Sequence, residues 1–206
     1  MSAPQGRRRG AHAAILAAAF LAGTALAQPA AVVLVAKPEL ADPNFSETVI
    51  LVTHAPTGET IGVVLNRPTS LRLAEVAPQF PHAQAYRAPL YRGGPVLPSV
   101  VVALFRSPSP PAASAFKVLP DAYLSLHPAI IDALLDKPAG RFRLFAGFSG
   151  WAAGQLESEI ARDAWYVLPA TEDLLFRDDT AGMWRELVEK ARGRRARFSA
   201  GGAGYT

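Results

Sequence analysis

The sequence predicts a single mixed α/β domain. Short apolar segments alternate irregularly with segments whose apolar residues recur at helical spacing, which favours a mixed sheet over a regular parallel βαβ array. Half of the 206 residues are hydrophobic, enough for a substantial core in one domain. The 18 prolines and 16 glycines indicate many turns between short elements.

Residues 1–27 have the three parts of a secretory signal peptide. Arg7-Arg8-Arg9 form the basic region, 13–21 the apolar region, and Ala25-Leu26-Ala27 the small-residue cleavage site. The apolar stretch is short for a membrane span of about 20 residues. We therefore expect cleavage after Ala27, no integral membrane span after cleavage, and export to the periplasm or beyond. An uncleaved anchor, a mis-assigned start and twin-arginine export are the alternatives.

The N-terminal part of the body, which begins at Gln28, is expected to consist mainly of strands. Ala31 to Ala36 is a β-branched run typical of a buried strand, and two prolines make 37–45 a loop. Further strands are predicted at 48–53, 60–65 and 100–105, with a hairpin turn at 55–59. Another strand is expected to end at Tyr91, where the chain enters a tight turn. Ser70 is predicted to cap a short helix through Leu71, Leu73 and Val76, and 78–89 and 107–114 are expected to be loops.

The C-terminal part is expected to hold most of the helices. Helices are predicted from Pro128 to about 137, after Gly154, at 171–176 with Thr171 as cap, and at 180–191. Strands are predicted at 116–119, 123–126, 142–148 and 165–168, and Gly147 and Gly150 are expected to end the third of these. The tail 193–206, basic and then glycine-rich, is expected to be flexible.

The charge pattern argues against nucleic acid as a partner of the folded body. The chain has 21 basic and 17 acidic residues, but three of the arginines lie in the leader and five basic residues lie at 190–197. Residues 28–189 therefore carry 13 basic and 17 acidic residues, a net charge of −4, whereas binding to nucleic acid needs a basic face. Cysteine is absent, which excludes disulfides, thiolate metal sites and a cysteine nucleophile.

Four motifs in a fixed order resemble a known family. They are Leu34-Val-Ala-Lys-Pro-Glu-Leu-Ala-Asp-Pro-Asn-Phe45, Gly62-Val-Val-Leu-Asn-Arg-Pro68, Tyr91-Arg-Gly-Gly-Pro95 and Gly147-Phe-Ser-Gly-Trp-Ala-Ala-Gly-Gln-Leu-Glu-Ser-Glu-Ile160. Together with Trp165 and the Trp184 helix, they make residues 31–192 similar to the AlgH/YqgE family of bacterial proteins. The domain organisation expected is a signal peptide at 1–27, an AlgH/YqgE-like domain at 28–192 and a tail at 193–206.

The resemblance implies a fold but no chemistry. It implies a compact domain with a bulged, barrel-like mixed sheet flanked by helices. The family is often labelled as transcriptional regulators, yet it lacks an established biochemical activity. Two features depart from the family: the export signal, where a cytoplasmic location is the family's expectation, and Ser149, where the family more usually has Ala.

No catalytic residue, metal or cofactor is predicted. Ser149 stands in Gly-Phe-Ser-Gly rather than Gly-x-Ser-x-Gly, so a small residue in a tight turn is favoured over a nucleophile. A base could reach it only through tertiary proximity of a histidine. The glycines at 147, 150 and 154 match no phosphate-loop pattern and favour close packing around Trp151. The histidines are scattered, and the pair Glu157 and Glu159 diverges on a helix, so neither predicts a metal site.

Arg67 is the most informative polar residue because it stands at a strand end beside Pro68. Its guanidinium is predicted to pair with the carboxylate of Asp42, Glu157 or Glu159, with Trp151 covering the pair; a ligand-binding arginine is the alternative. Because turns at strand ends present polar groups, we expect the dispersed motifs to meet in one binding or structural cluster. Its predicted members are Asp42, Asn66, Arg67, Gly93, Gly94, Trp151, Gln155 and Glu157.

Two classes of function are consistent with these features. The first is a non-catalytic binding or regulatory module, exported, whose partner is an unknown protein or small ligand. The second is an intracellular transcriptional regulator, as the family label implies, with a cytoplasmic location. Export would exclude the second class, because an exported protein cannot reach a promoter. A small hydrolase that uses Ser149 is a distant third.

Overall fold

The computed structural model describes residues 31–54, 60–138 and 140–201. The signal peptide predicted at 1–27 and the hairpin turn predicted at 55–59 lie outside the described residues. Among the described helices, none is both long and apolar enough to cross a membrane.

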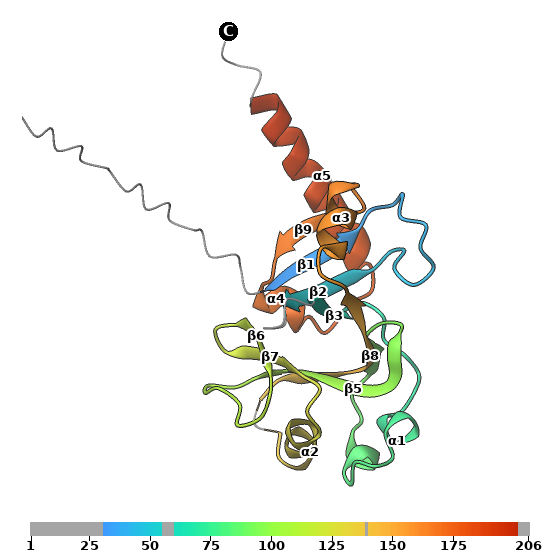
Figure 1. Cartoon of the computed structure of the whole chain (residues 1–206), viewed down its shortest axis with the longest axis vertical. Helices are drawn as coiled ribbons and strands as arrows, with labels where there is room; N and C mark the ends of the chain where they lie inside the picture. Colours follow the sequence, from blue (N-terminus) through green and yellow to red (C-terminus); the bar gives the residue numbers. More distant parts are fainter. Residues whose placement is uncertain (1–30, 55–59, 139, 202–206) are drawn as a thin grey trace, which may run out of the picture.

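The described strands form one strongly curled sheet (Figure 1). They are β1 (Ala31–Ala36), β2 (Val49–His54), β3 (Thr60–Val64), β4 (Leu90–Arg92), β5 (Val96–Arg106), β6 (Phe116–Leu119), β7 (Ala122–Ser125), β8 (Phe142–Trp151) and β9 (Trp165–Pro169). The order is β6-β7-β5-β8-β3-β2-β1-β9 with antiparallel neighbours, while β4 pairs with β8 in parallel. The sheet curls so far that β6 contacts β1 and β2. The mixed, barrel-like sheet is therefore confirmed.

β8 joins the two halves of this sheet. Its first part pairs with β5, and its last part, from Ser149 to Trp151, pairs with β3. Gly147 lies between the two parts with φ +70°, opposite a register shift in β5 between Val96 and Val101. The predicted strand end at Gly147 and Gly150 is wrong, because the chain bends there and the ladder continues with a new partner.

The helices cover the outer faces of the curled sheet and close its open side. They are α1 (Leu73–Val76), the 3₁₀ turn η1 (Ala83–Ala85), α2 (Pro128–Asp136), α3 (Gln155–Ala161), α4 (Glu172–Leu175) and α5 (Met183–Gly201). One apolar cluster fills the inside of the curl and includes Phe145 of β8, Leu175 of α4 and Leu187 of α5. A second lies under α1 and α2, and a third lies under α3. Figure 1 shows α1 and α2 beyond β5 and β8, with α5 beside β1.

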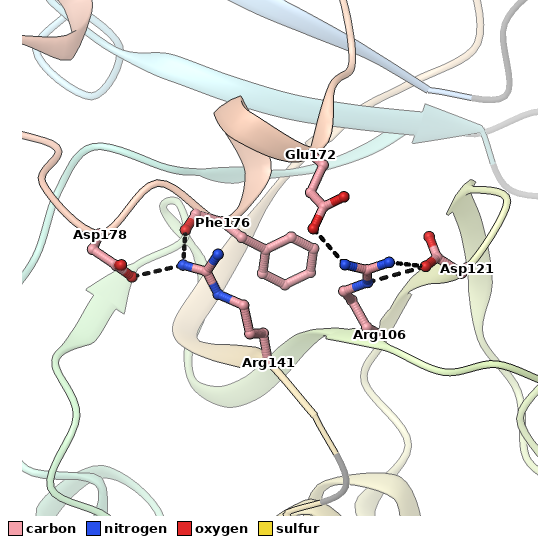
Figure 2. Close-up of polar contacts among 6 residues, drawn as sticks. All are labelled: Arg106, Asp121, Arg141, Glu172, Phe176 and Asp178. Atoms are coloured by element: carbon pink, nitrogen blue, oxygen red, sulfur yellow. Dashed lines mark hydrogen bonds and ion pairs between the residues drawn. The ribbon is translucent and has the colours of Figure 1, made fainter.

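Two arginines tie the α4 segment to the half of the sheet that holds β5 and β8 (Figure 2). Arg106, the last residue of β5, forms ion pairs with Asp121 and Glu172. Arg141 donates to the carbonyl oxygen of Phe176 at 2.5 Å and to Asp178 at 2.9 Å. The ring of Phe176 lies between the two arginine side chains in Figure 2, so α4 is held by packing as well as by charge.

Two predicted helix starts and ends differ from the structure. α1 begins at Leu73, and its cap is Arg72 with Glu75 rather than Ser70, because the Glu75 carboxylate accepts from the Arg72 backbone N–H at 2.9 Å. Leu71, a predicted apolar contact of this helix, is instead half exposed. α5 continues past the predicted end at Ala191 to Gly201, so the first part of the expected flexible tail is helical.

Candidate functional site

The loop at 42–48, which precedes β2, is fixed by the side chain of Asn66. The amide oxygen of Asn66 accepts from the Val49 backbone N–H at 2.8 Å, and its amide nitrogen donates to the Glu47 carbonyl at 2.9 Å. Within the loop, the Asp42 carboxylate accepts from the backbone N–H of Asn44 at 2.7 Å. Asp42 and Asn66 thus form hydrogen bonds with backbone groups of this loop. Such bonds are expected because the N–H and C=O groups of irregular backbone have no partners in a helix or sheet.

Arg67 holds the same loop from its other side. Its guanidinium donates to the carbonyl oxygens of Asn44 at 2.7 Å and Ser46 at 2.8 Å. The predicted ion pair with Asp42, Glu157 or Glu159 is wrong: within the described residues Arg67 forms no salt bridge. The loop carbonyls, which have no strand partner, satisfy the planar donor fork instead.

Arg92 lies beside Arg67 in a shared pocket of about 200 Å³. The two are linked through the backbone, where the Arg92 N–H donates to the Arg67 carbonyl at 2.8 Å and Pro68 bridges Tyr91. The pocket is lined by Asn44, Val64, Arg67, Thr69, Leu71, Arg92, Gly94, Pro95, Pro98 and Ala146. No hydrogen bond or ion pair engages the Arg92 guanidinium within the described part of the chain, so this cation faces the pocket and solvent.

The electrostatics of the pocket are those of two adjacent positive charges. Partial burial lowers the pKa of Arg67, the charge of Arg92 lowers it further, and Glu47 raises it by a smaller amount. Glu47 is not close enough to Arg67 to count as a salt bridge. The pocket therefore presents two cations that no carboxylate in the described chain neutralises by direct contact.

Gly93 and Gly94 bring the pocket wall against the bend in β8. A Cβ on Gly93 would lie 2.1 Å from the Gly147 carbonyl oxygen, and one on Gly94 would lie 2.3 Å from the carbonyl group of Phe148. The role of these two residues is therefore close approach of backbones.

Ser149 is fully buried next to these glycines, and its hydroxyl donates to the Gly93 carbonyl at 3.2 Å. The described histidines are engaged elsewhere: His54 with Thr60, His82 with the aspartates of α2, and His127 as the cap of α2. Ser149 thus has neither exposure nor a base, the two things a nucleophile requires.

A second polar cluster is built around Glu159. One oxygen of its carboxylate accepts from the indole N–H of Trp151 at 3.1 Å and from that of Trp165 at 3.0 Å. The other oxygen accepts from the Gln155 amide at 3.1 Å. The ring of Phe45, from the loop that Arg67 holds, stacks on Trp151 with centroids 5.9 Å apart. Both carboxylate oxygens of Glu159 accept hydrogen bonds from side chains of the protein, which is typical of a structural cluster.

The sequence model of the AlgH-like family matches residues 33–196. The chain belongs to the AlgH-like family. Its relatives include UPF0301 proteins of Thermobifida fusca, 36% identical over 78% of this chain and 85% of the relative, and of Streptomyces coelicolor, 35% identical over the same shares. The solution structure of the AlgH protein from Pseudomonas aeruginosa is 30% identical, with a TM-score of 0.62, covering 75% of this chain and 84% of that chain. A crystal structure from Corynebacterium diphtheriae is 25% identical, with the same TM-score, covering 79% and 86%.

In this AlgH-like protein the predicted single cluster divides into two. Arg67 and Gly94 line the two-arginine pocket, Asp42 and Asn66 fix the loop that supplies its lining residue Asn44, and Gly93 precedes Gly94 in the chain. Trp151 and Gln155 belong to the Glu159 cluster, whereas Glu157 is exposed and takes no part in either. The 42–48 loop joins the two groups, because it carries Phe45 to the indoles and its carbonyls to Arg67.

Arg92 is the pocket residue that the sequence-based prediction missed. A charged residue directly before two glycines in Tyr91-Arg-Gly-Gly-Pro95 was the available signal, since the glycines indicate close backbone approach and the arginine cannot be buried with them. The sequence predicts Glu159 as a candidate partner of Arg67 and not as part of a metal site, and its place in α3 does not indicate the two indoles.

Proposed function

We propose that this AlgH-like protein is a non-catalytic binding module whose ligand carries a small oxyanion, a carboxylate or phosphate group, held between Arg67 and Arg92. The observation that carries the proposal is the Arg92 guanidinium, which shares a pocket with a second arginine and has no anionic partner in the described chain. Two adjacent cations repel each other, and an anion placed between them removes that repulsion.

The two arginines are suited to different tasks. Arg67 is fixed in place by its two bonds to loop carbonyls, so it offers a positive charge and its remaining N–H groups in a set direction. Arg92 is exposed and has its whole donor fork available, the geometry that grips two oxygens of a carboxylate or phosphate at once. The one hydroxyl that lines the pocket, that of Thr69, donates to the Leu90 carbonyl at 2.8 Å, and no described histidine or carboxylate lines the pocket, so binding is the role that this pocket supports.

An anion titration tests this function. Acetate and inorganic phosphate are titrated into the purified protein while its ¹H–¹⁵N spectrum is recorded, and the Arg67 and Arg92 signals should shift with saturation. Arg92→Gln should weaken binding by about 10-fold or more, because a charge-assisted hydrogen bond contributes about 1.5–3 kcal/mol. Arg185→Gln removes an exposed arginine on α5 and should bind as the wild type does. Unchanged affinity in Arg92→Gln would overturn the proposal.

We further propose that the module acts outside the cytoplasm. The support is the order of basic, apolar and small residues in 1–27 and the net charge of −4 over 28–189, which does not favour duplex DNA as a partner. N-terminal sequencing of the protein from its native cell fraction tests this directly. A mature chain that starts at Gln28 is expected; Met1 intact in a cytosolic fraction would restore the transcriptional regulator as the leading function.

A further inference from the structure

Exposed apolar residues occur in two segments that line the two-arginine pocket. Three large hydrophobic residues are exposed in the described chain: Leu71 at 50%, Leu97 at 57% and Val167 at 45%. Leu71 lines the pocket, and Leu97 belongs to the segment 95–98, of which Pro95 and Pro98 line it. Scattered exposed hydrophobic residues need no explanation, but one that lines the pocket and a second in a segment that lines it mark a place where apolar surface leaves water on binding.

Leu97 is also held in an unfavourable backbone conformation. Its φ is +44°, in the left-handed region that non-glycine residues seldom adopt. The segment around it is pressed against the bend in β8, since a Cβ on Gly147 would lie 2.9 Å from the Val96 carbonyl oxygen and 3.2 Å from the Pro98 Cα. Strained residues of this kind concentrate at binding sites, where packing holds them in place. This is an observation independent of the exposure of Leu97.

From these features we infer that the ligand is a small amphiphilic acid. Its anionic group lies between Arg67 and Arg92, and its apolar body lies over Leu71 and the rim segment 95–98. The inference rests on the proposed anion site and adds the chemistry of the rest of the ligand. The pocket volume of about 200 Å³ is below the range of about 300–1,000 Å³ typical of drug-sized ligands, so the pocket holds the acid group and the rim receives the body. An inorganic anion would leave both leucines in water.

A homologous series of carboxylates tests the inference. Acetate, butyrate and hexanoate are titrated into the full chain, with hexylammonium as a probe of the same carbon number and opposite charge. Affinity should rise by about fourfold for each methylene that leaves water, so hexanoate should bind at least about 10-fold more tightly than acetate. Hexylammonium should not bind, because two arginines repel it.

Matched variants locate the apolar body. Leu71→Ser should lower the ratio of hexanoate affinity to acetate affinity by about fourfold or more. Leu97→Asn should do the same without a folding defect, because asparagine tolerates a positive φ. Val167→Ser removes the third exposed hydrophobic residue, in β9, and should change neither affinity.

The outcomes separate this inference from the proposed anion site. Equal affinities for acetate and hexanoate would overturn the amphiphilic ligand and leave the anion site standing. Binding of hexylammonium as tight as that of hexanoate, or a ratio that survives both leucine variants, would also overturn it. Failure of acetate, phosphate and hexanoate alike to bind would remove the anion site and this inference together.

Discussion

The carboxylate of Glu159 lies 3.1 Å from the indole nitrogen of Trp151, eight residues earlier in the chain. The same oxygen accepts from Trp165 at 3.0 Å, so one acidic side chain of α3 satisfies two buried indoles at the edge of the apolar cluster under α3. Phe45 then packs on both rings, with centroids 5.9 and 6.0 Å away. The motif that begins at Gly147 is therefore connected to the 42–48 loop through aromatic rings.

Glu159→Ala should destabilise the protein markedly. The substitution leaves the N–H groups of Trp151 and Trp165 buried without an acceptor, and each such group costs about 1–3 kcal/mol. We expect the free energy of unfolding to fall by about 2 kcal/mol or more, measured by urea denaturation with tryptophan fluorescence. Glu157→Ala, an exposed carboxylate on the same helix, should change it by about 0.5 kcal/mol at most. Equal effects of the two variants would contradict the role of Glu159.

Arg67→Ala and Arg92→Ala should separate stability from binding. Arg67→Ala loses two bonds to the 42–48 loop and should lower the free energy of unfolding by about 1–3 kcal/mol. Arg92→Ala loses no described contact of its side chain and relieves the repulsion that lowers the pKa of Arg67, so its stability should equal or exceed that of the wild type. Both should weaken anion binding. Thermal melts with and without phosphate measure the two effects, and a large loss of stability in Arg92→Ala would show an unrecognised structural role.

Gly94→Ala should be among the most damaging single-methyl additions in the chain. Its Cβ would lie 2.3 Å from the Phe148 carbonyl group, which is strand backbone and cannot move aside without breaking the β8 ladder. We expect a fall in Tm of several degrees or failure to fold, by circular dichroism. Gly193→Ala is the control: it lies in α5 with open space around it, and should stabilise the helix by up to about 1 kcal/mol.

Tyr86 should make stability fall at alkaline pH. Burial raises the pKa of Tyr86 to about 12, above its ordinary value of 10. The unfolded chain therefore loses this proton at a lower pH than the folded chain, so stability is complete below pH 10 and is lost as the pH rises from 10 to 12. The loss is at most about 1.4 kcal/mol per pH unit. Tyr86→Phe should reduce the fall of the urea midpoint with pH over this range. An unaltered dependence of the midpoint on pH would show that Tyr86 ionises freely in the folded protein.

Local sequence patterns were sufficient to predict the presence of most strands and helices. The run from Ala31 to Ala36 predicts β1 at its observed bounds. A strand buried on both faces is apolar throughout, so the strand begins and ends where the apolar run does. Pro128 likewise marks the start of α2, since proline suits the first turn of a helix. Such features depend on residues within one or two turns of each other.

Partners across the fold were decided only by tertiary packing. Gly147 indicated a break in the strand. Whether the strand ends or bends there depends on its pairing with β3, which lies more than 80 residues earlier in the chain, as the register of Gly62 with Ser149 shows. Arg67 signalled a hydrogen-bonding role, yet its acceptors are carbonyls that become available only because the 42–48 loop has no strand beside it. Arg92 became its neighbour through the pairing of β4, and Trp184 reaches the Ala36 carbonyl across 148 residues. Periodicity and turn chemistry are local properties of a chain, whereas the choice among many possible donors, acceptors and cations is made by the one packing that buries the core.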